Sequence, residues 1–245
     1  MVQSGPVIVT GESKRARILA RALRRHVPAL AVPTVRILDR LRSVRTLRTF
    51  NIAQYDSVVF TSGNAIQYFQ KLLWHLKIPI RAVPHVCAVG ARTKRLAKEA
   101  GFKVYFTPAV SDAVSLARKL PKVSGTRILF PCSKAAGREI DRILTRRGAN
   151  VTRLVLYEPK AISVSRSHLE RLFARQPRAL VITSPSGIPG FVRHMQQGIL
   201  RRARKTAVLC MGETTRAAAR KSGFTRTIVP SRATQEDLIK TILTL

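Results

Sequence analysis

The chain has few acidic residues, few aromatic residues and no long apolar run, and each shortage excludes a class of protein. Only 12 of its 245 residues are Asp or Glu, against 45 Lys and Arg, so a catalytic site built on paired carboxylates is not expected. The apolar runs are a few residues long, too short for a membrane-spanning helix. Aromatic residues make up 6% of the chain, and none alternate with arginine as in a groove that stacks bases.

Cysteine and histidine are also scarce, which removes the usual signals for metal or redox chemistry. Cys87, Cys132 and Cys210 show no CxxC or paired-ligand spacing. Cys87 and Cys210 lie in apolar, strand-like runs, where a cysteine usually acts as a small buried hydrophobe. The five histidines form no HExxH, and the chain contains no GxGxxG, GxxxxGK[ST] or GxSxG. Zinc, disulfide, dinucleotide, Walker-type and nucleophile-elbow sites are therefore unsupported.

The excess of basic residues gives a formal net charge of +33. Such a surface attracts polyanions of any kind. The basic residues are nevertheless spread over the segments interpreted as helices, which indicates solvated helix faces rather than one binding stripe. We therefore expect incidental nucleic-acid affinity rather than a nucleic-acid function. These segments are 14–25, 36–48, 92–98, 142–147, 166–178, 201–205 and 216–221.

Short β-branched runs alternate with amphipathic helical patterns along the whole chain. This order predicts an α/β fold with parallel sheets flanked by helices. Gly101, Gly148 and Gly223 each follow a helical pattern and are predicted to end those helices. The predicted strands are 7–9, 58–60, 86–89, 104–106, 128–130, 155–157, 180–182, 207–211 and 227–229, and helical patterns include 14–25, 65–73, 93–101 and 138–148.

One motif occurs twice, as VVFTSGNAIQYF at 58–69 and LVITSPSGIPGF at 180–191, with Ser62 and Ser184 separated by 122 residues. At the same offset, residues 86–120 align with 208–242, and the segment that begins at Val7 resembles 127–148. The chain therefore consists of two similar halves, roughly 6–122 and 127–245.

Two arrangements of these halves fit the order of the segments. A simple duplication gives two sequential domains. Alternatively, the extended, proline-containing segments 31–38 and 153–162 cross over between the halves. Residues 1–33 then pack with 160–245 to form domain 1, and 37–155 form an inserted domain 2.

Four junctions between a strand and the following helix carry small and hydroxyl residues. In parallel sheets, ligands bind beyond the carboxyl ends of the strands, where free backbone N–H groups and helix dipoles attract anions. Two such ends in each domain, facing one cleft, suit a ligand with many anionic groups. The alternative is that the serines and threonines are plain helix N-caps, and that the glycines only permit a tight turn. The junctions are 61–64, 90–93, 183–186 and 212–215.

Five segments in the same order and spacing resemble the uroporphyrinogen-III synthase family. This resemblance implies two α/β domains joined by a two-strand connector. It also implies a lyase of tetrapyrrole (porphyrin and heme) biosynthesis, which closes hydroxymethylbilane to uroporphyrinogen III with inversion of ring D, loss of water and no cofactor or metal. The segments are VVFTSGNAIQYF, AVGARTKRLAKEAGF, the run ILFPCSKAAGREIDRILTRRGANVTRLVLYEP, LVITSPSGIPGF and MGETTRAAARKSGF.

The resemblance also assigns site residues. Tyr157 matches the family's connector tyrosine, which positions or protonates the leaving hydroxyl; the alternative is a tyrosine that packs the hinge. Arg92 and Lys134 are expected to attract the substrate at long range. The remaining matched positions, and the glycines beside them, are expected to bind substrate carboxylates: Ser62, Gly63, Asn64, Gly90, Thr93, Ser184, Ser186, Gly212, Thr214 and Thr215.

The chain departs from the family pattern at Gly11, which follows Thr10 where family members usually carry an arginine. Two other hypotheses remain: a non-catalytic protein that binds nucleic acid or another polyanion on the same scaffold, and a small-anion receptor similar to solute-binding proteins. No leader segment is visible, so we expect a cytoplasmic protein, with an organellar stroma or matrix as the alternative. We also expect the protein to be a monomer.

Overall fold

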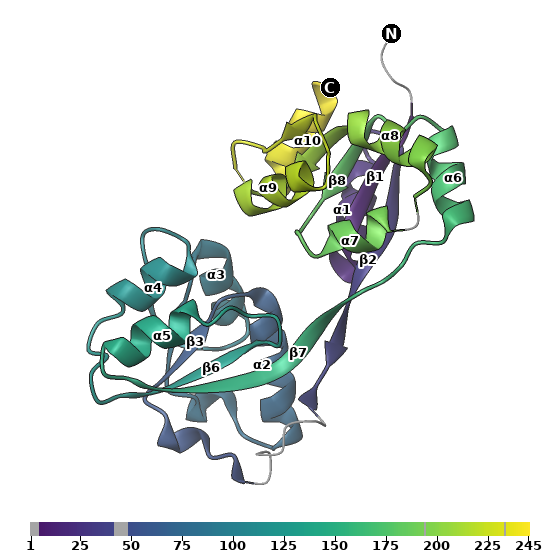
Figure 1. Cartoon of the computed structure of the whole chain (residues 1–245). Coiled ribbons are helices and arrows are strands. Elements are labelled where there is room, and N and C mark those ends of the chain that lie inside the picture. The colour runs from purple at the N-terminus through teal and green to yellow at the C-terminus, as the bar shows by residue number, and fades with distance from the viewer. Residues whose placement is uncertain (1–4, 42–48, 194, 233) are drawn as a thin grey trace. The chain divides into compact units, whose positions relative to one another are not determined.

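The computed structural model describes residues 5–41, 49–193, 195–232 and 234–245 (Figure 1). Strands and helices alternate, and neighbouring strands are parallel throughout each sheet segment for which pairing is described. The predicted α/β class, with parallel sheets flanked by helices, is thereby confirmed. Contacts between Cα atoms divide the chain into two compact units. Unit 1 contains the described residues up to Ile37 and Lys160–Leu245, and unit 2 contains Leu38–Pro159.

Unit 1 contains five neighbouring strands in the order β10-β9-β8-β1-β2. Both faces of its sheet are covered by apolar side chains, as expected for a parallel sheet. Val7 and Val9 pack with Leu19 and Leu238 on one face, whereas Ile8 packs with residues of the other helices on the opposite face. The elements are β1 (Val7–Glu12), α1 (Ser13–Leu23), β2 (Ala29–Asp39), α6 (Arg166–Ala174), β8 (Ala179–Ile182), α7 (Gly187–Val192), α8 (Gln197–Lys205), β9 (Ala207–Cys210), α9 (Glu213–Lys221), β10 (Thr227–Ile228) and α10 (Gln235–Leu243).

Unit 2 repeats this strand order as β5-β4-β3-β6-β7. Phe60, Phe69 and Phe102 pack against one another on one side of the sheet. Leu116 and Leu144, from two neighbouring helices, belong to a separate buried cluster. The elements are the 3₁₀ turn η3 (Ile52–Gln54), β3 (Ser57–Phe60), α2 (Gly63–His75), the 3₁₀ turn η4 (Ile80–Ala82), β4 (His85–Ala88), α3 (Ala91–Glu99), β5 (Val104–Phe106), α4 (Ala113–Lys119), β6 (Arg127–Ser133), α5 (Glu139–Arg146) and β7 (Asn150–Ala161).

The predicted repeat is visible in the secondary structure, because β3, β4 and α3 recur as β8, β9 and α9 at an offset of 122 residues. Gly101 and Gly223 end the two equivalent helices, each with a φ of 86°. Gly148 ends α5 with a φ of 87°. These angles lie in the left-handed region that glycine adopts without strain, so the predicted helix ends are confirmed.

Two predicted helical segments differ from the structure. Residues 36–39 belong to strand β2, and 42–48 lie outside the described residues. The spacing of arginines in 36–48 imitates a solvated helix, but pairing of β2 with its neighbours decides its conformation. The segment predicted as helical over 166–178 ends as a helix at Ala174, and Gln176 has a φ of 46°. The tight turn at Gln176 therefore separates α6 from β8.

Cys87, Cys132 and Cys210 are all buried as free thiols, as predicted for two of them. Burial raises the pKa of the Cys87 thiol to about 12 and those of Cys132 and Cys210 to about 11. The thiols are therefore protonated near neutral pH and poor nucleophiles. Within the described ranges, no helix is both long and apolar enough to cross a bilayer.

Candidate active site

The carboxyl edge of unit 2 brings together the ends of β3 and β4. The Val89 N–H donates to the Phe60 carbonyl at 3.0 Å, so the turns that lead into α2 and α3 begin side by side. Ser62, Gly63 and Asn64 lie in the first turn, and Gly90 in the second. Gly90 is required by packing, because a Cβ atom there would lie 2.7 Å from the Ser111 hydroxyl oxygen. The sequence thus predicts the placement of these two turns correctly.

Ser62 has two partners at this edge. It is the N-cap of α2, and its hydroxyl oxygen accepts the Ala65 N–H at 3.2 Å. The same oxygen lies 2.9 Å from the phenolic oxygen of Tyr157. The plain N-cap interpretation of Ser62 is therefore correct but incomplete, because the cap also contacts the tyrosine that the sequence singled out.

Tyr157 is placed by its strand pairing. It lies on β7 opposite Ser133, the last residue of β6, and its carbonyl accepts the Lys134 N–H at 2.9 Å. Its ring stacks on that of Tyr68 from α2, with centroids 5.1 Å apart and planes inclined by 18°. Both tyrosines are more than 90% buried. The phenol therefore has a fixed position against the amino end of α2.

Burial determines the protonation state of Tyr157. Loss of solvation raises the pKa of the phenol above its usual 10.0, and the hydrogen bond with Ser62 partly opposes this shift. The phenol is therefore neutral throughout the physiological range, and it acts as a hydrogen-bond donor or weak acid rather than as a base.

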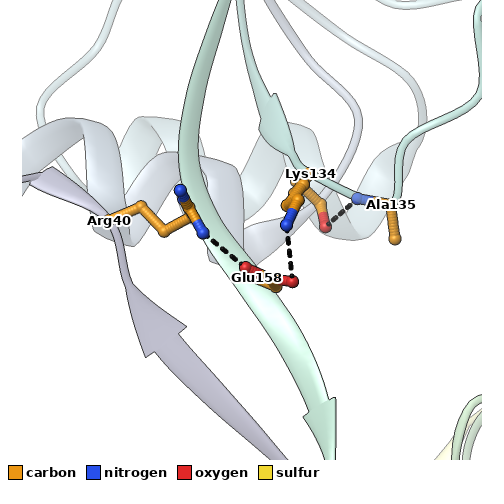
Figure 2. A network of polar contacts seen from close by, with 5 residues as sticks. Arg40, Lys134, Ala135 and Glu158 are labelled. Atoms are coloured by element: carbon orange, nitrogen blue, oxygen red, sulfur yellow. Dashed lines mark hydrogen bonds and ion pairs between the residues drawn. The ribbon is translucent and has the colours of Figure 1, made fainter. Parts of the chain in front are cut away.

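Three charged groups lie next to Tyr157 along the chain or the sheet. Glu158 accepts a hydrogen bond from Arg40 at 2.6 Å and another from Lys134 at 3.1 Å (Figure 2). The contact with Lys134, followed by that with Arg40, lowers the pKa of the Glu158 carboxyl. The three side chains are about one quarter to one half exposed. The arrangement is an ion-pair network with two cations for one carboxylate.

Unit 1 has an equivalent carboxyl edge with different contacts. The Met211 N–H donates to the Ile182 carbonyl at 3.3 Å, which repeats the Val89–Phe60 contact of unit 2. Ser184, however, does not cap a helix; its hydroxyl lies 3.0 Å from that of Ser186, and α7 begins only at Gly187. The plain N-cap alternative for Ser184 is therefore wrong.

Helices α3 and α9 begin at glycines that provide no capping side chain. Gly90 and Gly212 are their N-caps, and neither residue has a side chain that could bond the first N–H groups. Thr93 and Thr215 lie at equivalent positions in the first turns and are both buried. Thr214 and Arg92 are exposed. Of the threonines expected to bind carboxylates in these turns, Thr93 and Thr215 are therefore buried, and Thr214 is exposed.

The first strand of unit 1 explains the departure at Gly11. Gly11 has a φ of 123°, and its N–H donates to the Thr34 hydroxyl at 3.1 Å. A Cβ atom at this position would overlap the Thr183 hydroxyl, so arginine is excluded by both backbone conformation and space. The next residue, Glu12, accepts the N–H groups of Lys14 and Arg15 at 2.8 and 3.0 Å. The amino end of α1 is therefore already satisfied by the protein's own carboxylate.

Sequence reasoning missed Tyr68, Arg40 and Glu12. Tyr68 lies in a helical apolar pattern that predicts burial but names no partner, and Arg40 lay in the segment wrongly predicted as helical. Glu158, one of only 12 acidic residues, lies in strand β7. The signal that could have pointed to Glu158 is the scarcity of acidic residues in a basic chain, because each carboxylate there attracts several cations.

Comparison with known proteins identifies the family. Residues 17–240 match the family model described as "Uroporphyrinogen-III synthase HemD". The chloroplastic uroporphyrinogen-III synthase of Oryza sativa subsp. japonica is 27% identical over 97% of this chain and 79% of its own length. The uroporphyrinogen-III synthase of Chlorobaculum parvum is 24% identical over 91% of this chain and 92% of its own length.

Two solved structures have the same fold. The uroporphyrinogen-III synthetase of Helicobacter pylori matches with a TM-score of 0.68 at 16% identity, over 98% of this chain and 99% of that chain. A mutant uroporphyrinogen III synthase of Thermus thermophilus matches with a TM-score of 0.61 at 18% identity, over 97% of this chain and 99% of that chain. With the family model covering nearly the whole sequence, the chain belongs to the uroporphyrinogen-III synthase family.

Proposed function

We propose that the protein closes hydroxymethylbilane to uroporphyrinogen III, with inversion of ring D and loss of water, as a lyase that needs no cofactor. The observation that carries this proposal is the contact between Ser62 and Tyr157 at the carboxyl edge of unit 2. It places a neutral phenol and a helix-capped hydroxyl together, in a chain whose family is named for this reaction.

The direction of the Ser62–Tyr157 hydrogen bond matters for the proposed chemistry. The Ser62 oxygen accepts the Ala65 N–H, and the geometry of the Ser62–Tyr157 contact allows either hydroxyl to donate; we propose the arrangement in which the serine hydrogen points to the Tyr157 oxygen. Ser62 then donates to Tyr157, and the phenolic hydrogen remains available for the substrate. The amide at the positive end of α2 strengthens this polarity by polarising the Ser62 hydroxyl.

A weak acid suffices for the first step. The terminal pyrrole nitrogen expels the hydroxyl, which takes the phenolic proton and leaves as water, giving an azafulvene cation. Attack at the substituted carbon of ring D, fragmentation and reclosure then release one ring proton, which returns to the phenolate. Ser62 stabilises the phenolate in between by donating its hydrogen bond.

Control of the isomer requires orientation more than acid strength. The substrate also closes without a catalyst, to isomer I, so the protein needs only to favour attack at the substituted carbon. A hundredfold preference corresponds to about 2.7 kcal/mol of barrier difference. Binding carboxylate arms of the substrate at the first turn of α3, which follows Gly90 at the same edge of unit 2 as Ser62, is proposed to provide that orientation.

We further propose that units 1 and 2 act as two domains, with β2 and β7 as the connector. The protein is proposed to work as a monomer. Because the substrate carries eight carboxylates, the reaction is proposed to take place in an aqueous compartment. That compartment is the cytoplasm or an organellar stroma or matrix.

The test uses purified protein and freshly generated hydroxymethylbilane, with isomers I and III separated by chromatography. We expect isomer III to dominate, whereas a reaction without protein gives isomer I. A product mixture identical to the uncatalysed one would refute the proposal. It would favour the alternative of a polyanion-binding protein, for which nucleic-acid affinity should fall steeply with salt.

A further inference from the structure

We infer that Arg40 and Lys134, held in place by Glu158, form a binding subsite for one carboxylate arm of the substrate. This inference rests on the proposed function, because it names how that substrate is held. It assigns direct contact with substrate to Arg40 and Lys134, and a positioning role to Glu158.

The three residues come from different parts of unit 2 but meet at one place. Arg40 follows the end of β2, Lys134 follows the end of β6, and Glu158 lies on β7 directly after Tyr157. Figure 2 shows the Glu158 carboxylate between the two cations, with one oxygen toward each. One carboxylate thus contacts both cations and holds them on the same side of β7 as Glu158.

The backbone around this network is ordered by further hydrogen bonds. The Lys134 N–H donates to the Tyr157 carbonyl at 2.9 Å, and the Ala135 N–H donates to the Ser133 hydroxyl at 3.1 Å. The Arg40 N–H donates to the Leu156 carbonyl at 2.9 Å. Both cations are therefore anchored to the strand that carries Tyr157, so their positions are coupled to that of the phenol.

Most hydrogen-bond donors of Arg40 and Lys134 are not used in the described contacts. The described contacts use one N–H of the Arg40 guanidinium and one of the Lys134 ammonium, whereas these groups carry five and three donors. About one third of Arg40 and more than half of Lys134 is exposed. The network has an excess of one positive charge and open donors, which suits a carboxylate from solution.

The position of the network sets which arm it binds. Adjacent residues of a strand point to opposite faces, so Tyr157 faces α2 while Glu158 faces away from it. A carboxylate bound there belongs to an arm remote from the bond that breaks. Loss of the subsite should therefore weaken substrate binding more than it slows the chemical step.

The experiment compares Arg40→Gln, Lys134→Gln and the double variant with two charge-matched controls, Lys119→Gln and Arg146→Gln. The controls remove the same charge from the exposed last residues of α4 and α5. We expect each site variant to raise KM for hydroxymethylbilane about fivefold, with kcat within about twofold of wild type. The controls should leave both constants nearly unchanged.

Two further measurements separate binding from folding and from the reaction itself. Uroporphyrin carries the same eight carboxylates but does not react, so its titration measures binding alone. The dissociation constants of the site variants should rise in parallel with KM. The affinity of the site variants should also depend less steeply on salt than that of the wild type. Glu158→Gln should raise KM about twofold, because it releases the two cations but leaves their charge.

The outcomes are distinguishable. If the wild type forms no isomer III, the proposed function fails, and uroporphyrin titration still tests the subsite. If the wild type is active but the site variants match the controls in KM and uroporphyrin affinity, the subsite is wrong. A fall in KM for Glu158→Gln would overturn the positioning role, since it would show that Glu158 competes with the substrate.

Discussion

The two units carry different side chains at the same position of an identical strand register. In unit 2, the pairing of β6 with β7 shifts after Cys132, and Ser133 lies opposite Tyr157. In unit 1, the pairing of β1 with β2 shifts after Gly11, and Glu12 lies opposite Val35. Both units therefore share the strand pairing and its register shift, but unit 1 has Val35 where unit 2 has the phenol of Tyr157. Backbone repetition therefore gives no reason to expect two equal sites.

The helices that follow β3 and β8 differ in the same sense. Helix α2 has 13 residues and is capped by Ser62, whereas α7 has 6 residues and lacks a side-chain cap. Gly190 allows α7 to approach the backbone closely, because a Cβ there would lie 2.6 Å from the Ile162 carbonyl oxygen. Unit 2 thus has a rigid, capped helix behind its candidate acid, and unit 1 has a short helix fitted against backbone.

The largest expected effect is the loss of stability when a methyl group is added at Gly11, where the pairing of β1 with β2 shifts. Gly11→Ala should lower the free energy of unfolding by about 3 kcal/mol, because the left-handed φ and the overlap with Thr183 both oppose a side chain. Gly137→Ala, at an unobstructed glycine of unit 2, is the control and should cost less than about 1 kcal/mol. Equal midpoints in urea denaturation would contradict the structural account of Gly11.

The next largest effect concerns the phenol that only unit 2 carries at this register position. Tyr157→Phe should lower kcat about tenfold to a hundredfold, since a positioned proton donor is lost, while isomer III remains the main product. Tyr105→Phe, at a tyrosine that is 54% exposed, should leave turnover unchanged. Isomer analysis by chromatography and steady-state kinetics measure both effects; loss of isomer control in Tyr157→Phe would show that the phenol orients the substrate.

A smaller contrast is expected between the two repeated serines. Ser62→Ala removes the N-cap of α2 and should destabilise the protein by about 1 kcal/mol, with slower turnover. Ser184→Ala should change stability by less than about 0.5 kcal/mol, because Ser184 caps no helix. Urea denaturation of both variants decides the point, and equal losses would mean that the capping difference between the units is not real.

The smallest expected effect is a pH dependence of stability. It comes from the phenol of Tyr157, whereas Val35, at the equivalent position of unit 1, does not titrate. The pKa of Tyr157 is raised in the folded state, so its contribution to stability is complete below the unfolded value of 10.0 and is lost as pH rises beyond it. Between pH 9 and 11, the unfolding free energy of the wild type should therefore fall more steeply than that of Tyr157→Phe. Parallel curves in urea titrations would contradict burial of the phenol.

Much of the fold follows from local sequence signals. The β-branched runs at 58–60 and 180–182 lie within strands, and the glycines at 101, 148 and 223 end helices. Two signals conflict over residues 36–38, because the spacing of arginines predicts a helix over 36–48 whereas 31–38 is predicted to be extended; pairing between strands decides between them, and Arg36 is in β2. Long-range pairing of this kind leaves no periodic trace in the sequence.

The candidate site was predictable only in part. Ser62 and Tyr157 were singled out by the repeat and by resemblance, respectively, but their contact joins residues 95 positions apart. Tyr68 reads as an ordinary apolar helix residue, and the partners of Glu158 depend on where β2 and β6 end. A sequence identifies residues that can take part in chemistry, whereas strand register determines which of them meet.

Strands β2 and β7 each begin in one unit and end in the other, and this connectivity has a consequence for synthesis on the ribosome. Unit 2 is contiguous and can fold as soon as residue 159 has emerged from the exit tunnel. The first 37 residues must wait for the last 86, Lys160–Leu245, before their hydrophobic strands are covered. During that interval the nascent amino-terminal segment is the part of the chain most exposed to chaperones.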